Sequence, residues 1–202
     1  MPARNRDLHG NVPDQAPAAL LLIDIINALE FEGGDALLGE ALPMAKRLAA
    51  LVERARRARL PIVYVNDNFG KWRSDFSKLL DHCLHDGVRG QALAELLRPA
   101  SDDYFVLKPK HSGFFATTLD VLLRYLGVTT VVLTGLTADN CVLFTASDAF
   151  LRDYELVIPP DCVASENAEQ TRRALEHMQR VLKARLTSSV DLDLEQLTRR
   201  AA

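Results

Sequence analysis

The sequence predicts a three-layer α-β-α fold, in which helices cover both faces of a mainly parallel sheet of about six strands. Two observations lead to this fold class. The chain has 202 residues, 48% of them hydrophobic and 25% charged, which is enough apolar material for one domain with a substantial core. Short apolar runs also alternate with longer segments whose apolar residues recur every three or four positions, as in a parallel sheet with helical crossovers.

The first expected strand, 19–25, is an almost unbroken apolar run that carries the carboxylate of Asp24 near its end. Such a run is typical of a central strand that is buried on both faces. Asp35, which follows two glycines, is expected to cap a long helix with apolar residues at three- and four-residue steps. A second strand at 61–65 then leads into a polar loop at 66–70.

The rest of the chain continues the alternation of helix and strand. Thr117 and Asp120 resemble a capping box that opens a helix ending at Gly127. The other helices are expected at 76–84, 91–97, 140–152 and 167–184, and the other strands at 104–107, 128–134, 155–158 and 186–190. This order predicts a Rossmann-like sheet that binds its ligand beyond the carboxyl ends of the strands.

No repeat, low-complexity block or linker interrupts residues 17–190, so we interpret residues 1–202 as a single domain. Residues 1–16 are expected to form a flexible arm or to pack on a neighbouring subunit, and residues 191–202 to form a C-terminal tail with a short helix. The N-terminal segment is charged and lacks the apolar region of a secretory signal, which favours a cytoplasmic location.

The balance of charges argues against a nucleic-acid partner. Lys and Arg total 24 against 27 Asp and Glu, so the chain has no surplus of positive charge for a polyanion. The longest mostly apolar run, 18–26, is less than half of the roughly 20 residues that a membrane span needs. We therefore expect a small-molecule substrate and no membrane. The spacing of the three cysteines fits neither a metal knuckle nor a disulfide framework, so free thiols are expected.

Three different reactive side chains fall near the predicted strand ends: Asp24, Lys108 and Cys141. Cys141 lies in the first turn of a predicted helix, where backbone N–H groups and a nearby ammonium would lower the thiol pKa. A carboxylate beside the thiol can act as a general base and then as an acid. Each residue alone has an ordinary structural interpretation, as a turn residue, a solvated lysine or a small buried hydrophobe. Together they form a complete set for nucleophilic catalysis.

Motifs of other enzyme classes are absent from the sequence. It contains no GxGxxG, GxxxxGK[ST], HExxH or GxSxG pattern, which argues against nucleotide binding and against zinc-protease or serine-hydrolase chemistry. His82 and His85 have a spacing compatible with metal ligation on one helix face, but no third ligand lies nearby in the sequence. A solvated pair is the interpretation that we favour for these histidines.

Three stretches of the chain carry a family resemblance. They are LLLIDIINAL at 20–29, VLKPKHSGFFATTLDVLL at 106–123 and VVLTGLTADNCVLFTASDAFLRDYELVIPPDCVAS at 131–165. In order and spacing they resemble the signature blocks of the isochorismatase-like cysteine hydrolases, a superfamily that includes nicotinamidases, N-carbamoylsarcosine amidases and ureido-group hydrolases.

The resemblance implies a role for each member of the reactive set. Asp24 would be the general base and acid, Lys108 would stabilise the thiolate and the transition state, and Cys141 would be the nucleophile. It also implies a non-proline cis peptide between Leu136 and Thr137. The backbone N–H groups of Thr137 and Cys141 would then form an oxyanion hole.

Departures from the family pattern narrow the expected activity. Ala138 stands where many relatives have threonine. Nicotinamidases carry an Asp-x-His element that holds a metal, whereas this chain reads Asp67-Asn68-Phe69 at the corresponding place. We therefore expect no metal and no other cofactor.

The resemblance predicts a hydrolase that cleaves a C–N bond of a small amide, ureide or carbamoyl compound through a thioester. Two alternatives stay open: hydrolysis of a vinyl ether with Asp24 as the acid, and binding of a small molecule without turnover. The residues expected to contact the substrate are Phe31, Asn66, Asn68, Trp72 and Phe114, with Thr137 beside them. Because the helix at 140–152 is apolar on more than one side, and family members commonly associate, we expect a homo-oligomer, either a dimer or a tetramer.

Overall fold

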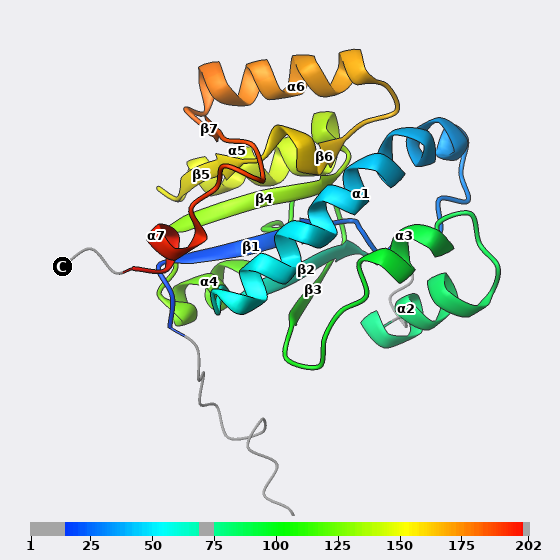
Figure 1. Cartoon of the computed structure of the whole chain (residues 1–202), viewed down its shortest axis with the longest axis horizontal. Helices are drawn as coiled ribbons and strands as arrows, with labels where there is room; N and C mark the ends of the chain where they lie inside the picture. Colours follow the sequence, from blue (N-terminus) through cyan, green and yellow to red (C-terminus); the bar gives the residue numbers. More distant parts are fainter. Residues whose placement is uncertain (1–14, 69–74, 200–202) are drawn as a thin grey trace, which may run out of the picture.

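The computed structural model describes residues 15–68 and 75–199, which form a single parallel sheet between two layers of helices (Figure 1). The strands follow the order β3-β2-β1-β4-β5-β7, and β6 pairs with the carboxyl end of β4. Every pairing is parallel. The strands are β1 (Ala18–Ile23), β2 (Ile62–Asp67), β3 (Tyr104–Lys108), β4 (Thr130–Leu136), β5 (Glu155–Ile158), β6 (Val163–Ala164) and β7 (Arg185–Leu186). The predicted fold class is confirmed.

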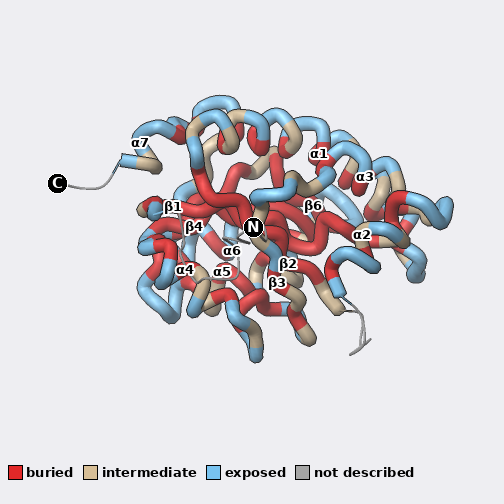
Figure 2. The backbone as a smooth tube through the Cα atoms, turned by 90° about the horizontal axis from the view of Figure 1, so that it is seen from below, coloured by how far each residue is buried: buried red, intermediate tan, exposed pale blue. Residues whose placement is uncertain are grey.

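The helices divide between the two faces of the sheet. The first face is covered by α1 (Gly34–Arg57), α2 (Phe76–His85), α3 (Gln91–Leu96) and α7 (Leu194–Thr198). The second is covered by α4 (Leu119–Leu126), α5 (Leu143–Phe150) and α6 (Ala168–Val181). In β1, Leu20 and Leu22 face the first core, and Leu21 and Ile23 face the second. This central strand is therefore buried throughout, as Figure 2 shows, and its sequence is continuously apolar.

Asp35 does not cap α1. The helix begins at Gly34, and its N-cap is Gly33, which has a φ of 84° in the left-handed region that glycine tolerates. A Cβ on Gly34 would lie 2.1 Å from the carbonyl oxygen of Leu29, so the chain can turn into the helix only with glycine at this point. The Asp35 carboxylate instead pairs with Arg89 at 2.8 Å.

The capping box expected at Thr117 and Asp120 is also absent. Thr118 is the N-cap of α4 and makes no side-chain capping bond. The Thr117 hydroxyl accepts a hydrogen bond from the N–H of Leu119 at 3.2 Å, and Asp120 pairs with Arg124 at 3.2 Å. The Asp120 carboxylate is therefore engaged by an arginine one turn along the same helix and does not cap the helix start.

Several strand and helix boundaries differ from the prediction. The second strand includes Asn66 and Asp67, which were expected in a loop, because both pair in register with β3. The helix expected at 140–152 begins as a separate π-helical turn, Ala138–Val142, and α5 follows it. The last strand is only Arg185–Leu186, and β6 was not predicted, since two residues are too short to show a periodic pattern.

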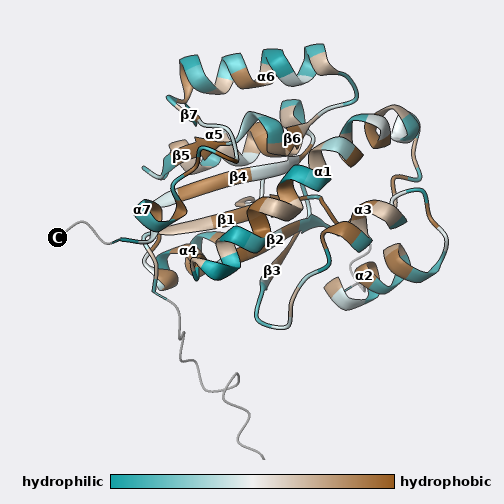
Figure 3. Ribbon diagram, viewed as in Figure 1, coloured by the Kyte–Doolittle hydropathy of each residue, from teal (hydrophilic) through white to brown (hydrophobic). Residues whose placement is uncertain are grey.

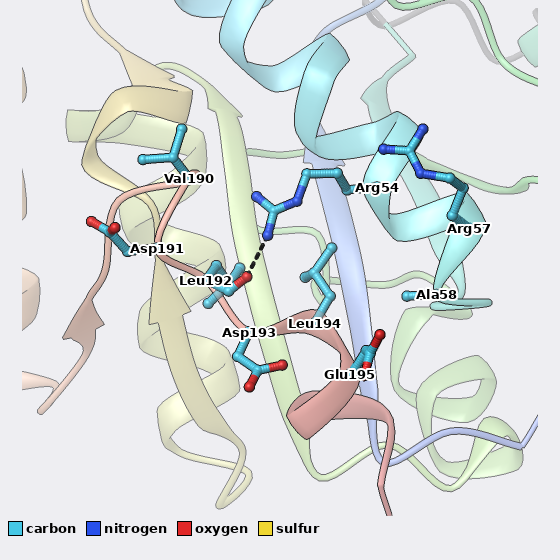
Figure 4. A pocket seen from close by; sticks show the side chains of 9 residues that line it. All are labelled: Arg54, Arg57, Ala58, Val190, Asp191, Leu192, Asp193, Leu194 and Glu195. Atoms are coloured by element: carbon cyan, nitrogen blue, oxygen red, sulfur yellow. Dashed lines mark hydrogen bonds between the residues drawn. The ribbon is translucent and has the colours of Figure 1, made fainter.

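The C-terminal segment crosses the face of α1. The Arg54 guanidinium donates hydrogen bonds to the carbonyl oxygens of Ser189 and Leu192, the latter at 2.6 Å (Figure 4). Asp193 caps α7 by accepting a hydrogen bond from the N–H of Gln196 at 2.9 Å. A groove of about 630 Å³ lies between this segment and α1.

Helix α6 is mostly exposed. In Figure 3, α6 is largely hydrophilic, and among its residues Ala174 and Met178 are the buried ones. No helix within residues 15–68 and 75–199 has both the length and the apolar character required to cross a membrane.

Candidate active site

The three reactive side chains named from the sequence meet at the carboxyl edge of the sheet. Asp24 directly follows β1, Lys108 ends β3, and Cys141 lies in the π-helical turn after β4. The Lys108 Nζ atom is 2.8 Å from Asp24 Oδ2 and 3.4 Å from Cys141 Sγ. Their convergence follows from the parallel topology, which places the carboxyl ends of these strands at one edge.

Local backbone geometry orients the carboxylate of Asp24. Its φ is 50°, a left-handed conformation that aspartate adopts more readily than most residues. Its backbone N–H donates to the carbonyl oxygen of Val65, and its Oδ1 accepts a hydrogen bond of 2.7 Å from the N–H of Asp67. The second carboxylate oxygen, Oδ2, lies 2.8 Å from the Lys108 ammonium.

Asp67 is a member of this cluster that the sequence analysis missed. Its Oδ2 lies 3.5 Å from the Lys108 Nζ atom. The signal lay in strand periodicity: Asp67 is two residues after Val65, which faces the same core as Val106 and therefore the same side of the sheet as Lys108. Assigning Asp67 to a loop concealed this relationship.

Burial changes the electrostatics of all three side chains. Lys108 is fully buried and Asp24 is 5% exposed. Burial raises the pKa of Asp24, an effect that the Lys108 ammonium partly offsets. The pKa of Lys108 also rises, because the pull of Asp24, Cys141 and Asp67 on its charged form outweighs the opposing effect of burial.

The Cys141 thiol is likewise shifted toward its neutral form. Burial and the Asp24 carboxylate raise its pKa to about 12, against a smaller opposing effect of Lys108. We expected the helix N-terminus and the Lys108 ammonium to lower the pKa of the Cys141 thiol. That expectation is wrong, because the effect of burial is larger than the effect of the ammonium. The arrangement can hold the proton on sulfur and pass it to the adjacent carboxylate when sulfur attacks an electrophile.

A second residue that the sequence analysis missed, His111, reaches the sulfur from the exposed side. Its Nδ1 atom is 3.9 Å from Cys141 Sγ, and its ring lies against that of Phe144 with centroids 5.5 Å apart. His111 follows Lys108 by only three residues, so the same strand end delivers both side chains. His111 lies inside the block 106–123 that carries the family resemblance, but the resemblance gave it no role.

Hydrogen bonds hold the turn that carries the nucleophile, both within the turn and to the segment after β6. The peptide bond between Leu136 and Thr137 is cis, at the position that the family resemblance implied. The carbonyl oxygen of Thr137 accepts hydrogen bonds from the N–H groups of Asn140 and Val142, both at 3.1 Å. Asp139 accepts a hydrogen bond from the Ser165 hydroxyl at 2.6 Å, which joins the turn to the segment after β6.

Gly135 allows β4 to approach β1 closely just before this turn. Its φ is 110°, and a Cβ at this position would lie 2.1 Å from the carbonyl oxygen of Ile23. Glycine is therefore required where the two strands that carry Asp24 and Cys141 come together.

The residues expected to contact the substrate range from fully buried to exposed. Asn66 is fully buried, and its Nδ2 donates to the carbonyl oxygen of Ile26 at 2.8 Å, so it supports the loop after β1. Phe114 packs in the second core, with its ring 5.9 Å from that of Tyr154, which makes it a core residue. Phe31 is exposed, and Asn68 and Thr137 are half-buried. Trp72 lies outside the described residues.

Neither histidine of α2 lies in the cluster. His82 pairs with Asp86 at 2.6 Å, and His85 pairs with Asp81 at 2.7 Å, both one turn along the helix. Within the described parts of the chain, no three His, Cys, Asp or Glu side chains come together in a way that could hold a metal ion.

Comparisons with known proteins agree on one family. The isochorismatase domain model matches residues 18–189. The chain is 38% identical over 174 residues to YaaI of Bacillus subtilis, an uncharacterized isochorismatase family protein, which covers 86% of this chain and 95% of that protein. It is 30% identical over 188 residues to the ureidoacrylate amidohydrolase RutB of Methylobacterium radiotolerans, covering 80% and 72% of the two chains.

A solved structure shows the same likeness. The N-carbamoylsarcosine amidase of Thermoplasma acidophilum superposes with a TM-score of 0.67 at 29% identity, covering 87% of this chain and 98% of that chain.

Proposed function

The chain belongs to the isochorismatase family of hydrolases, and from this premise we propose that it cleaves a C–N bond of a small amide, ureide or carbamoyl compound through a thioester on Cys141. One observation carries the proposal: the buried Lys108 ammonium lies within 3.4 Å of the Cys141 sulfur and 2.8 Å from Asp24. A nucleophile, a base and a fixed positive charge therefore share one edge of the sheet. Relatives named as amidohydrolase and amidase support the choice of bond.

The first chemical step follows from the shifted pKa values. The Cys141 sulfur attacks the substrate carbonyl carbon as its proton passes to the Asp24 carboxylate, because neither group favours its charged form strongly in the buried site. Lys108 stabilises the negative charge that develops on sulfur and carboxylate during the transfer. The tetrahedral intermediate then loses its nitrogen group, which must gain a proton as the C–N bond breaks. Water hydrolyses the resulting thioester and restores the thiol.

The negative charge on the carbonyl oxygen needs hydrogen-bond donors. We assign this role to the backbone N–H groups of Thr137 and Cys141, in the turn that starts at Leu136. Thr137 is the N-cap of the π-helical turn and Cys141 lies within it, where the first N–H groups have no acceptor in a preceding turn. Asn68 and Thr137 are the half-buried polar residues on adjacent loops that we assign to substrate binding.

A vinyl ether substrate is the second candidate, and the raised pKa of Asp24 favours it, because cleavage of that bond needs an acid and no nucleophile. The two candidates differ in their need for sulfur. The cytoplasmic location and the independence from metal both stay predictions.

The deciding experiment measures product release from ureidoacrylate, N-carbamoylsarcosine, nicotinamide and isochorismate by wild type, Cys141→Ala and Asp24→Asn, with and without a chelator. Release of ammonia from an amide or ureide that requires both Cys141 and Asp24 supports the proposal. Turnover of isochorismate that survives in Cys141→Ala would replace amide cleavage with vinyl ether cleavage. Loss of activity with the chelator would contradict the metal-free mechanism.

A further inference from the structure

The turn that carries Cys141 is held by a second segment of the chain, which runs from β6 to Ser165. Strand β6 pairs with the last two residues of β4, directly before the turn. Ser165 follows β6 and reaches the turn itself, where its hydroxyl contacts Asp139. One short segment therefore holds the chain on both sides of Thr137.

The Ser165 hydroxyl makes two hydrogen bonds to the same residue. It donates to Asp139 Oδ1 at 2.6 Å and accepts from the Asp139 N–H at 3.3 Å. The backbone N–H of Ser165 donates to the Thr171 hydroxyl at 2.9 Å, which ties the serine to α6. Ser165 is fully buried, and a hydrogen bond of a buried group is electrostatically stronger than one in water. The pair of bonds therefore holds Asp139 in one orientation.

Other hydrogen bonds show which N–H groups of the turn are already used. Those of Asn140 and Val142 donate to the carbonyl oxygen of Thr137, and that of Asp139 donates to the serine hydroxyl. Of the two donors that we assign to the oxyanion, the N–H of Thr137 precedes these groups in the chain and the N–H of Cys141 lies among them. The apolar side chains of the turn pack in the second core, but such packing does not set the direction of a peptide N–H. Hydrogen bonds to the neighbouring peptide groups set that direction.

We propose that Ser165 is a positioning residue, which acts through Asp139 to keep the two assigned N–H donors directed at the substrate oxygen. This inference rests on the proposed function. Donors stabilise an oxyanion best when they are in place before the charge develops, so rotation of a peptide group in this turn lowers the rate even where the fold is retained. Ser165 itself takes no part in proton transfer or bond formation.

The first test compares two reactions of the same sulfur in Ser165→Ala. Hydrolysis of the amide or ureide selected by the substrate panel passes through an oxyanion. Alkylation of Cys141 by iodoacetamide does not, because sulfur displaces iodide from a saturated carbon. We expect kcat and kcat/KM for the amide to fall together by about 10²-fold, since the lost interaction belongs to the transition state. The alkylation rate should be unchanged.

Ser189→Ala is the matched control for the loss of a buried serine–aspartate pair. Ser189 is buried, its hydroxyl donates to Asp161 Oδ2, and its N–H donates to Asp161 Oδ1 at 2.8 Å, in the segment before β6. We expect this variant to lose stability in urea titrations as Ser165→Ala does, but to keep the wild-type kcat, because the bonds to Asp139 are intact.

Variants at Asp139 test the same contact from an exposed position, so the core is left undisturbed. Asp139→Asn keeps an oxygen that can accept from Ser165 and should retain most of the turnover. Asp139→Ala loses that oxygen and should lower kcat, though by less than Ser165→Ala, because the backbone N–H of residue 139 can still donate to the serine. The double variant Ser165→Ala, Asp139→Ala should be no slower than Ser165→Ala alone, since both changes remove one interaction.

Several outcomes would overturn the proposal. Unchanged kcat in Ser165→Ala would do so, and an equal loss of turnover and alkylation would mean that the serine positions the sulfur instead. A loss of kcat in Ser189→Ala equal to that in Ser165→Ala would assign the effect to general loosening of the fold. If Ser165→Ala does not fold, equal activity of Asp139→Ala and Asp139→Asn overturns the proposal. A wild type that hydrolyses no amide or ureide would overturn the proposed function together with this inference, and it would be seen before any variant is made.

Discussion

The Nζ atom of Lys108 lies 3.4 Å from the sulfur of Cys141, although β2 and β1 separate the strands that lead to these residues. Neighbouring strands are about 4.8 Å apart, so the lysine side chain must extend across the end of the sheet to reach the sulfur. It does so fully buried, between the carboxylates of Asp24 and Asp67. The lysine is therefore both an electrostatic component of the site and a link between the edge strand and the centre of the sheet.

Replacement of the nucleophile should abolish amide hydrolysis. We expect Cys141→Ala to lower kcat by at least about 10³-fold, the scale of nucleophile deletions, and Asp24→Asn to be nearly as damaging. Ammonia release gives the rates, and far-ultraviolet circular dichroism shows whether the fold is retained. Full activity of Cys141→Ala together with loss in Asp24→Asn would contradict acyl transfer.

Removal of the buried ammonium should destabilise the protein. Lys108→Met leaves the Asp24 and Asp67 carboxylates without their shared cation, so we expect the free energy of unfolding to fall by about 3–5 kcal/mol in urea titrations. The double variant Lys108→Met, Asp24→Asn serves as the control. It should recover part of the lost free energy of unfolding, because it removes one of the two carboxylates left without a cation. Equal stability of Lys108→Met and wild type would show that the cluster contributes no net coupling.

The pH dependence of activity should reflect the raised pKa of Asp24. This carboxyl must be ionised to accept the thiol proton, and its pKa lies above the ordinary value of 3.8. The acidic limb of kcat/KM, which reports groups of the free enzyme, should therefore fall at a higher pH than an ordinary aspartate would give. A limb at or below pH 3.8 would argue against Asp24 as the base.

Access should decide which cysteine is alkylated first. Burial raises the pKa of all three thiols, to about 12 for Cys141 and Cys162 and to about 11 for Cys83, so acidity does not favour Cys141. Cys141 alone of these three is partly exposed, and the other two are buried. Substoichiometric iodoacetamide followed by peptide mapping should label Cys141 first, and preferential labelling of Cys83 would refute this.

The proposed homo-oligomer can be tested on α5 and the turn after it. Phe150 is 40% exposed and Leu151 is 76% exposed, and both are apolar side chains that a partner subunit would cover. We expect wild type to sediment as a dimer or tetramer, and Leu151→Glu to shift the equilibrium toward the 22.4 kDa monomer. Sedimentation of wild type as a monomer at micromolar concentration would contradict the proposal.

Local patterns in the sequence were sufficient to predict part of the candidate site. Asp24, Lys108 and Cys141 could be named because each lies near the end of a strongly apolar segment, and the parallel order of the strands brings such ends together. The sequence could not place Phe114, because an aromatic residue near a strand end looks the same in sequence whether it lines a pocket or packs in the core, as its ring does against Tyr154. Asp35 and Thr117 were misassigned because capping depends on the backbone path. Gly33 is the N-cap of α1 and leaves Asp35 to pair with Arg89, and Thr118 is the N-cap of α4.

By itself the sequence determined the layered α/β fold, the edge at which chemistry would occur and the residue types present there, because these depend on hydrophobic periodicity and chain order. Only the tertiary structure decided the partners of Lys108, the position of His111 beside the sulfur and the direction of the Cys141 pKa. Each depends on distance and burial across strands that are remote in sequence. Desolvation in particular arises from everything packed around a group, so no local pattern could show that burial of Cys141 outweighs the ammonium of Lys108.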